Sequence, residues 1–336
     1  MLENTTERPK VALVDLDGQP VPEWVRQNLR QAGINLIVRD CKTRADLAAH
    51  AGDANVIWLF GGSRILQGNL DAVANCRAIL RTGSGTDNVP VEEATRRHII
   101  VANTPAAMSD GVSDHLIAIM FTVIRRVAEL DRAVREGRWG RTPVQPLNRV
   151  QGRTLGLVGF GHAAREVARK LTGFEMRILV HDPFVSDESI TAHHAVASSL
   201  NDLLAESDYV SLHCPLTPET LHLIGERELR SMKPTAVLLN TARGPIIDES
   251  ALVKALHEGW IAAAGLDVLE QEPPPSDHPL LALNNVVVTP HVAGYAFDGV
   301  TIRWRVSVET VLTLARGKTP SSWVNRFADD GQRAGC

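Results

Sequence analysis

Short runs of β-branched and other apolar residues alternate with longer amphipathic stretches along most of the chain. Continuous apolar runs separated by helical patterns are typical of parallel strands that helices cover on both faces. The runs form two successive series, so the pattern predicts two α/β units in tandem. The first series is 11–16, 36–38, 56–60, 78–80 and 99–101, and the second is 155–160, 178–181, 210–213, 236–239, 262–268 and 286–289.

Two amphipathic stretches lie outside this alternation. Between the two series, apolar residues recur at three- and four-residue spacing over 109–138, which predicts one long half-buried helix. Another helix is predicted over 298–316, because Gly317 and Pro320 follow it. The second sheet offers no place for this last helix, so we expect the chain to return to the first unit. The predicted domains are 1–103 plus 295–336, and 104–294.

Composition and charge exclude several classes of protein. The 336 residues are 44% hydrophobic and 22% charged, as in an ordinary globular protein. A formal net charge of −4 gives no sequence-wide attraction to nucleic acid or to a membrane surface. Residues 1–10 lack the apolar core of a secretory signal, and the apolar stretch 116–124 is about half of the roughly 20 residues that cross a bilayer. We therefore expect a cytoplasmic protein with no membrane span that acts on a small molecule.

The cysteines give no sign of a disulfide framework or a metal site. Cys41, Cys76, Cys214 and Cys336 are far apart in the sequence and form neither a CxxC pair nor a metal-ligand cluster. We expect reduced thiols and no bound metal. Only 141–148 has the composition of a proline-containing surface loop.

A glycine-rich segment follows the first strand of the second series. Gly159 permits a tight turn, Gly161 lets the backbone approach a pyrophosphate, and Ala164 occupies the third position of the fingerprint, where a small residue allows close helix–sheet packing. Free amides at the start of the helix that follows would hold the phosphate charge. A purely structural strand–helix turn is the alternative interpretation.

An acidic residue stands where a dinucleotide site needs one. Asp182 ends the next predicted strand, 21 residues after Gly161. A carboxylate there can accept the ribose hydroxyls of NAD and would repel the extra phosphate of NADP, so the spacing predicts a preference for NAD. A turn or capping role before Pro183 is the alternative.

Three further segments carry a family resemblance: 240–244 (NTARG), 266–273 (LDVLEQEP) and 289–294 (TPHVAG). With them the chain resembles the D-2-hydroxyacid dehydrogenases over roughly residues 55–315. The resemblance implies two parallel-sheet α/β domains, a discontinuous flavodoxin-like substrate domain and a Rossmann NAD-binding domain. It also implies hydride transfer between NAD and a small 2-hydroxy or 2-keto acid.

By motif, the catalytic unit of that family corresponds to Arg243, Glu272 and His291. Each follows a predicted strand, at the edge where open parallel sheets bind ligands. An imidazole, with an ordinary pKa of about 6.5, can protonate the alkoxide formed from a ketone. Glu272 would favour the protonated imidazole and orient it, and Arg243 would hold the substrate carboxylate and polarise the carbonyl.

Each of these residues also has an ordinary alternative. Glu272 alone could be a solvated surface acid and Arg243 alone an ion-pair residue. Most histidines are surface or satisfied core residues, and six are interpreted in that way. They are His115, His162, His181, His193, His194 and His222.

The resemblance assigns further contacts and an assembly. The assembly implied is a homodimer formed through the NAD-binding domain. The resemblance counts Asp267 among the cofactor residues, but a structural role at the end of a strand is an equal alternative for it. Besides Gly159, Gly161 and Asp182, the cofactor residues are His162, Ala163, His213, Pro215, Thr241, Ala242, Asp267 and His291. The substrate residues are Gly61, Gly62, Ser84 and Gly85, together with Arg243.

Departures from the family pattern bear on the substrate. Relatives acting on 3-phosphoglycerate have an arginine in the first substrate loop, where this chain has Phe60, although Arg64 is close by. A phosphorylated substrate is therefore not expected. Two other functions stay open, an NAD-sensing corepressor similar to the C-terminal-binding proteins and a phosphite dehydrogenase. Formate dehydrogenases pair the histidine with glutamine, whereas this chain has Glu272.

Overall fold

The computed structural model describes residues 8–16, 18–140, 147, 149–296 and 299–327. The chain divides into two compact units, one formed by Met1–Met108 with Phe297–Cys336 and the other by Ser109–Ala296. Except for Leu147, the loop predicted over 141–148 lies outside the described residues. The two units are described one at a time.

A five-stranded parallel sheet forms the centre of the first unit. Its strand order is β2-β1-β3-β4-β5, the flavodoxin-like arrangement that the family resemblance implies. The inner strands are buried on both faces because a cluster of apolar side chains covers each side, whereas the edge strand β2 is only partly buried. The strands are β1 (Lys10–Asp15), β2 (Asn35–Val38), β3 (Val56–Leu59), β4 (Ala78–Arg81) and β5 (Ile100–Asn103).

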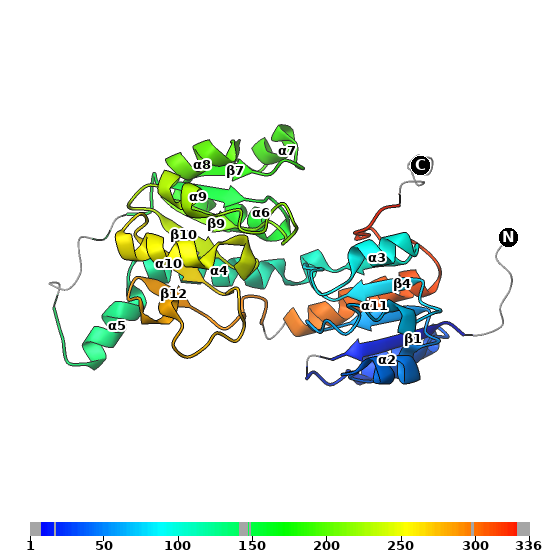
Figure 1. Ribbon diagram of the computed structural model, residues 1–336. Coiled ribbons are helices and arrows are strands. Elements are labelled where there is room, and N and C mark those ends of the chain that lie inside the picture. Colours follow the sequence, from blue (N-terminus) through cyan, green and yellow to red (C-terminus); the bar gives the residue numbers. More distant parts are fainter. Residues whose placement is uncertain (1–7, 17, 141–146, 148, 297–298, 328–336) are drawn as a thin grey trace. The chain divides into compact units, whose positions relative to one another are not determined.

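The helix near the end of the chain completes this first unit. Residues Gly299–Ala315 form α11, which packs against β1, β3, β4 and α1. In Figure 1 it lies beside β1 and β4. Trp304 of α11 is buried and stacks on Phe60 with 3.9 Å between ring centroids. The other helices of the unit are α1 (Glu23–Gln31), α2 (Arg44–Ala51) and α3 (Val91–Arg96), with short 3₁₀ turns η1 (Leu70–Ala72) and η2 (Pro105–Met108).

A seven-stranded parallel sheet forms the second unit. Its order is β12-β11-β10-β9-β6-β7-β8. Successive strands are added on one side of β6 up to β8 and on its other side from β9 onward, so the order of the strands reverses between β6 and β9. Ligands of such sheets bind at this reversal, beside the carboxyl ends of the strands. The sequence pattern missed only the two-residue strand β8. The strands are β6 (Thr154–Val158), β7 (Arg177–His181), β8 (Val196–Ala197), β9 (Tyr209–Leu212), β10 (Val237–Asn240), β11 (Ala263–Leu266) and β12 (Val286–Val288).

Local capping fixes several helices of the second unit. The Ser199 hydroxyl accepts the N–H of Asp202, the Asp248 carboxylate accepts the N–H of Ala251, and Gly259 ends a helix at φ +75°. The helices are α4 (Ser109–Ile124), α5 (Val127–Arg135), α6 (His162–Lys170), α7 (Asp187–Thr191), α8 (Leu200–Glu206), α9 (Glu226–Ser231) and α10 (Glu249–Glu258). The 3₁₀ turns are η3 (Thr172–Phe174), η4 (Gly244–Ile246) and η5 (Pro279–Ala282).

The single helix predicted over 109–138 is wrong. It breaks between α4 and α5 at Arg126, which has φ +51° and whose guanidinium binds the Glu129 carboxylate through two nitrogens. The apolar spacing continues across the break without glycine or proline, so the pattern contains no stop signal. Beyond it, Val127 is 51% exposed and Val134 is 48% exposed, because α5 does not follow α4 along the sheet.

One helical stretch among the described residues, Pro105–Ile124, is long and apolar enough to cross a membrane by length and composition alone. The core helix of a soluble protein meets the same criterion. Here α4 packs against β10, β11, β12 and α6, with Leu116 and Met120 fully buried. Packing inside the second unit therefore accounts for part of its apolar composition, since 39% of the apolar window is buried.

Candidate catalytic and dinucleotide site

The glycine loop connects β6 to α6 at the carboxyl edge of the second sheet. Gly159 has φ +91°, and a Cβ there would lie 2.6 Å from the backbone nitrogen of Cys214, so only glycine allows this loop to touch the loop after β9. Gly161 caps α6 without a side-chain hydrogen bond, and a Cβ there would meet nothing within 4 Å. The start of α6 therefore offers uncapped amides beside open space, which fits a pyrophosphate.

Asp182 lies at the end of β7, beside the glycine loop. Its carboxylate accepts the N–H of Phe160 at 2.7 Å and the N–H of Phe184 at 2.9 Å. The bond to Phe184 forms the local turn that was the alternative interpretation of Asp182. The bond to Phe160 connects the carboxylate to the glycine loop. The glycine loop and Asp182 line the same cavity, which has a volume of about 210 Å³. Its lining residues are Phe160, Gly161, His162, Arg165, Asp182 and Val185.

The loop after β9 lies next to the glycine loop. The backbone N–H of His213 donates to Val158 O at 2.7 Å, and the ring Nε2 lies 2.9 Å from the Ser211 hydroxyl. Burial lowers the pKa of His213 to about 4, so the ring is neutral at pH 7. Pro215, in the same loop, is exposed.

The loop after β10 carries Thr241, Ala242 and Arg243. It is held by the buried Asn240 side chain, which accepts the N–H of Ala242 and donates to the carbonyl of Arg243 at 2.8 Å. Among the described residues, no partner contacts the buried Thr241 hydroxyl. A polar atom in this position fits a cofactor contact, because buried polar groups otherwise find a partner.

Gly244 brings the loops after β10 and β11 together. A Cβ at this position would lie 2.0 Å from the carbonyl carbon and oxygen of Leu269, so no larger residue fits. Leu269 in turn donates its N–H to Glu272 Oε1 at 3.0 Å. The backbone contact therefore places the Arg243 loop against the loop that carries Glu272.

Glu272 and His291 form the acid–imidazole pair that the motifs predict. Glu272 Oε2 lies 2.6 Å from His291 Nδ1, and the two side chains are 36% and 48% exposed. Burial alone would raise the pKa of Glu272, but the His291 hydrogen bond, the N–H of Leu269 and the charge of Arg243 outweigh it, so that the pKa is lowered. Glu272 is thus an ionised acceptor for the imidazole.

The residues assigned to the substrate lie in the first unit. Gly61 and Gly62 follow β3, and Ser84 and Gly85 follow the neighbouring strand β4. The carbonyl of Ser84 accepts the Asn103 amide at 2.7 Å. The two loops therefore share the carboxyl edge of the first sheet.

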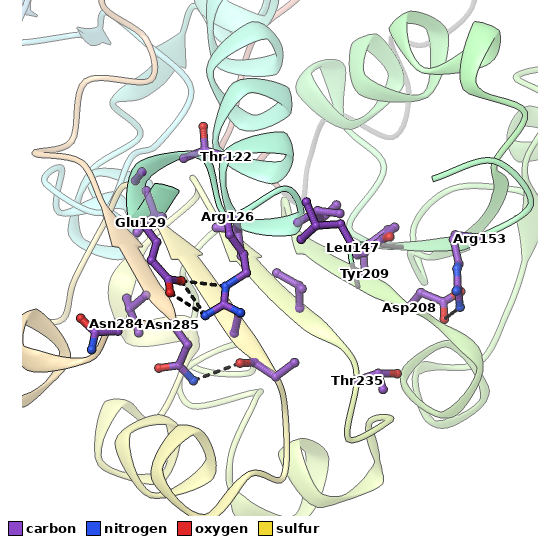
Figure 2. Close-up of a pocket in the computed structure, with 18 of the residues that line it drawn as sticks. Thr122, Arg126, Glu129, Leu147, Arg153, Asp208, Tyr209, Thr235, Asn284 and Asn285 are labelled. Atoms are coloured by element: carbon purple, nitrogen blue, oxygen red, sulfur yellow. Dashed lines mark hydrogen bonds and ion pairs between the residues drawn. The ribbon is translucent and has the colours of Figure 1, made fainter. Parts of the chain in front are cut away.

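The larger cavity of the second unit lies at the opposite end of its strands (Figure 2). It has a volume of about 400 Å³ and is bordered by the first residues of β9, β10, β11 and β12. Two ion pairs lie at this cavity, Arg126 with Glu129 and Arg153 with Asp208 (Figure 2). No motif residue lines it.

Sequence reasoning missed the residues that support the site. Asn240 and Gly244 stand inside a recognised motif, but their roles depend on contacts with a different loop. Thr289 begins the histidine motif and hydrogen-bonds to Asp267. No cluster of His, Cys, Asp or Glu in the described parts of the chain is arranged to hold a metal ion.

A dinucleotide loop, an acid after β7 and an acid–imidazole pair on one sheet edge define an NAD-linked oxidoreductase of the doubly wound class. Residues 117–293 match the family model of the D-isomer specific 2-hydroxyacid dehydrogenase, NAD binding domain. A glyoxylate reductase of Korarchaeum cryptofilum is 42% identical over 86% of this chain and 84% of its own length. The chain belongs to the D-2-hydroxyacid dehydrogenase family.

Two further similarities extend over nearly the whole chain. A glyoxylate reductase of Thermofilum pendens is 36% identical over 95% of both chains. The solved NADPH-dependent glyoxylate/hydroxypyruvate reductase of Sinorhizobium meliloti, in complex with NADP and malonate, is 27% identical with a TM-score of 0.81, covering 95% of this chain and 98% of that one. The protein is therefore an NAD-binding oxidoreductase acting on CH–OH donors, and the corepressor and phosphite alternatives are not favoured.

Proposed function

We propose that this enzyme reduces a small 2-keto acid of the glyoxylate class to the corresponding 2-hydroxy acid, with Arg243, Glu272 and His291 as its catalytic residues. The observation that carries the proposal is the 2.6 Å bond between His291 Nδ1 and Glu272 Oε2, on the sheet edge that also holds the glycine loop. Bound NADH supplies the hydride. The residues of this chain supply the proton and the orientation.

His291 is proposed as the proton donor. Because Nδ1 is bound to the ionised Glu272, Nε2 is the ring nitrogen left to protonate the substrate oxygen. The carboxylate stabilises the imidazolium before the proton is transferred. In the direction of oxidation the same nitrogen accepts the hydroxyl proton.

Arg243 is proposed to hold the substrate carboxylate and polarise the neighbouring carbonyl. A guanidinium presents two parallel N–H donors in one plane, which a 2-keto acid matches. The Asn240 side chain holds the backbone of this loop through its hydrogen bonds to Ala242 and Arg243. As further substrate-binding residues we propose Gly61, Gly62, Ser84 and Gly85, in two loops of the first unit.

The names of the relatives support the substrate class. Glyoxylate reductases with 42% and 36% identity match this chain. Purified enzyme should be given glyoxylate, hydroxypyruvate, pyruvate, a longer 2-keto acid and phosphohydroxypyruvate, while NADH loss is followed at 340 nm. The highest kcat/KM is expected with glyoxylate or hydroxypyruvate. A clear preference for phosphohydroxypyruvate would contradict the proposal.

For the cofactor we propose the residues of the glycine loop and its neighbours, Gly159, Gly161, His162, Ala163, His213, Pro215, Thr241 and Ala242. We also propose that Asp182 favours NADH over NADPH by accepting the ribose hydroxyls. Arg165 lies in the same cavity and is the cation that could offset Asp182. The ratio of kcat/KM for the two cofactors tests this, and Asp182→Ala should shift the ratio toward NADPH.

We propose that the enzyme is a homodimer formed through the NAD-binding unit. Helix α5 supports this, because its apolar side chains Val127 and Val134 and the nearby Trp139 are exposed. Light scattering of the purified protein would measure the mass, and a monomer at micromolar concentration would contradict the proposal. We further propose a cytoplasmic location, which fits the free thiols of Cys41, Cys76 and Cys214.

A further inference from the structure

Asp267, at the end of β11, is a buried acid surrounded by hydrogen-bond donors. Its side chain is 1% exposed. Oδ1 accepts the Thr289 hydroxyl at 2.5 Å and the N–H of Val292 at 2.9 Å, and Oδ2 accepts the N–H of Ala293 at 2.8 Å. All three donors belong to the loop after β12, and His291 stands in the middle of that loop.

A histidine of α4 extends this arrangement. His115 Nε2 lies 3.0 Å from the Thr289 hydroxyl oxygen and 3.4 Å from Asp267 Oδ1. Since that hydroxyl donates its proton to Asp267, it must accept from His115, which assigns the ring proton to Nε2. No sequence motif distinguishes His115 from the other histidines. We call Asp267, Thr289 and His115 the Asp267 network.

The loop held by this network has an unfavourable backbone conformation at its central residue. His291 has φ +53°, in the left-handed region that residues with a Cβ rarely adopt. Its N–H donates to the carbonyl of Asp267 at 2.8 Å, so Asp267 contacts the loop through its backbone as well as its side chain. Such conformations persist where surrounding contacts over-determine them.

We infer that the Asp267 network is a positioning device that holds His291 in this conformation, with Nδ1 turned toward Glu272. The inference rests on the proposed role of His291 as proton donor. It gives Asp267 a part in addition to the cofactor contact that the family resemblance implies. A carboxylate has about four acceptor sites, and three donors already occupy it in a buried position.

Thr289→Val is the sharpest test, because it removes the hydroxyl that joins Asp267 to His115 and keeps the size of the side chain. We expect kcat for glyoxylate reduction to fall about tenfold, while the Kd for NADH, measured by fluorescence, changes less than about twofold. Thr289→Ser restores the hydroxyl and should recover most of kcat. A role in overall stability alone would not separate kcat from cofactor binding in this way.

Hydrogen exchange of the enzyme without cofactor gives a readout independent of turnover. In Thr289→Val, amide exchange over residues 289–293 should accelerate by about tenfold, while exchange in β6 and β9 is unchanged. Asp267→Asn should accelerate the same segment, because an amide nitrogen cannot accept the N–H of Ala293. Circular dichroism checks that each variant is folded.

Three results separate the possibilities. If Thr289→Val keeps wild-type kcat and loop exchange while His291→Ala loses turnover, the positioning inference is wrong and the proposed function stands. If Asp267→Asn weakens NADH binding strongly and Thr289→Val has no effect, Asp267 acts on the cofactor. If His291→Ala itself retains turnover, the proposed function fails, whatever the network does.

Discussion

The two edges of the second sheet both hold acid–base pairs, yet only one edge is built for chemistry. At the amino edge, Arg126 is bound by Glu129, and Asp208 accepts from Lys233 and Arg153. Arginine and lysine keep their charge throughout the neutral range, so these pairs do not exchange protons with a substrate. They stabilise strand starts and a helix break.

At the carboxyl edge, one partner of the pair is an imidazole, a group that can both donate a proton to a substrate and accept one from it. His291 and Glu272 both stand on loops and are partly exposed, so a ligand can reach them. The larger cavity lies at the amino edge and the smaller one at the carboxyl edge. Here the kind of partner, and not the cavity volume, distinguishes the chemical edge from the structural one.

The largest expected effect is that of His291→Ala. Loss of the proposed proton donor should lower kcat for keto-acid reduction by about 100- to 10,000-fold. NADH affinity, measured by fluorescence titration, should change much less than kcat, because the imidazole is proposed to act on the substrate oxygen and not on the cofactor phosphates. The matched control at the other edge is Glu129→Gln, which should retain kcat. Near wild-type turnover in His291→Ala would remove the distinction between the two edges.

Arg243→Lys should have the next largest effect. Lysine keeps the positive charge but cannot offer two parallel donors to the carboxylate, so the substrate loses orientation. We expect kcat/KM to fall by about 100-fold, with a higher KM and a lower kcat. Steady-state kinetics with glyoxylate measure both. If only KM changed, Arg243 would bind substrate without orienting the carbonyl.

Glu272→Gln should have a smaller effect that depends on pH. Glutamine can still contact His291 Nδ1, but the negative charge that favours the imidazolium is gone. The alkaline limb of the kcat profile for keto-acid reduction should therefore move to lower pH, with a modest loss near pH 6. An unchanged profile between pH 5 and 9 would mean that the carboxylate does not support the protonated imidazole.

Much of the fold and the motif residues could be predicted from the sequence. Strands appear as apolar runs because helices bury both of their faces, and the fingerprint at Gly159 and Gly161 has a fixed local geometry. The helix break at Arg126 could not be predicted, since no glycine or proline marks it. Neither could the strand β8, whose two residues are too short to form a pattern.

The supporting residues of the site were beyond sequence reasoning for a different reason. Position 244 must be glycine because the backbone of Leu269 lies against it. His115 lies within hydrogen-bond distance of Thr289, although it belongs to a helix 174 residues earlier in the sequence. Such contacts depend on how loops from separate strands meet, which local patterns do not encode. Motifs therefore indicate candidate catalytic groups, and the structure shows which residues hold them in place.

The smallest predicted effect concerns stability at the amino edge. Asp208 accepts the N–H of Thr154 at 2.9 Å and contacts Lys233 and Arg153. Burial would raise its pKa, but these partners outweigh burial and lower the pKa. Asp208→Asn should therefore reduce the free energy of unfolding at pH 7 by about 1 kcal/mol, while kcat stays unchanged.

The pH dependence makes this last prediction specific. Because the folded-state pKa of Asp208 lies below the ordinary value of about 3.9, its stabilisation is complete above that pH and is lost as pH falls through the folded-state value. Urea unfolding should show wild type and Asp208→Asn converging in strong acid. Asp131→Asn, in an exposed pair with Arg135, is the control and should not change the midpoint measurably. If Asp208→Asn instead lowered kcat without a change in stability, the amino edge would take part in function, and the contrast between the two edges would have to be abandoned.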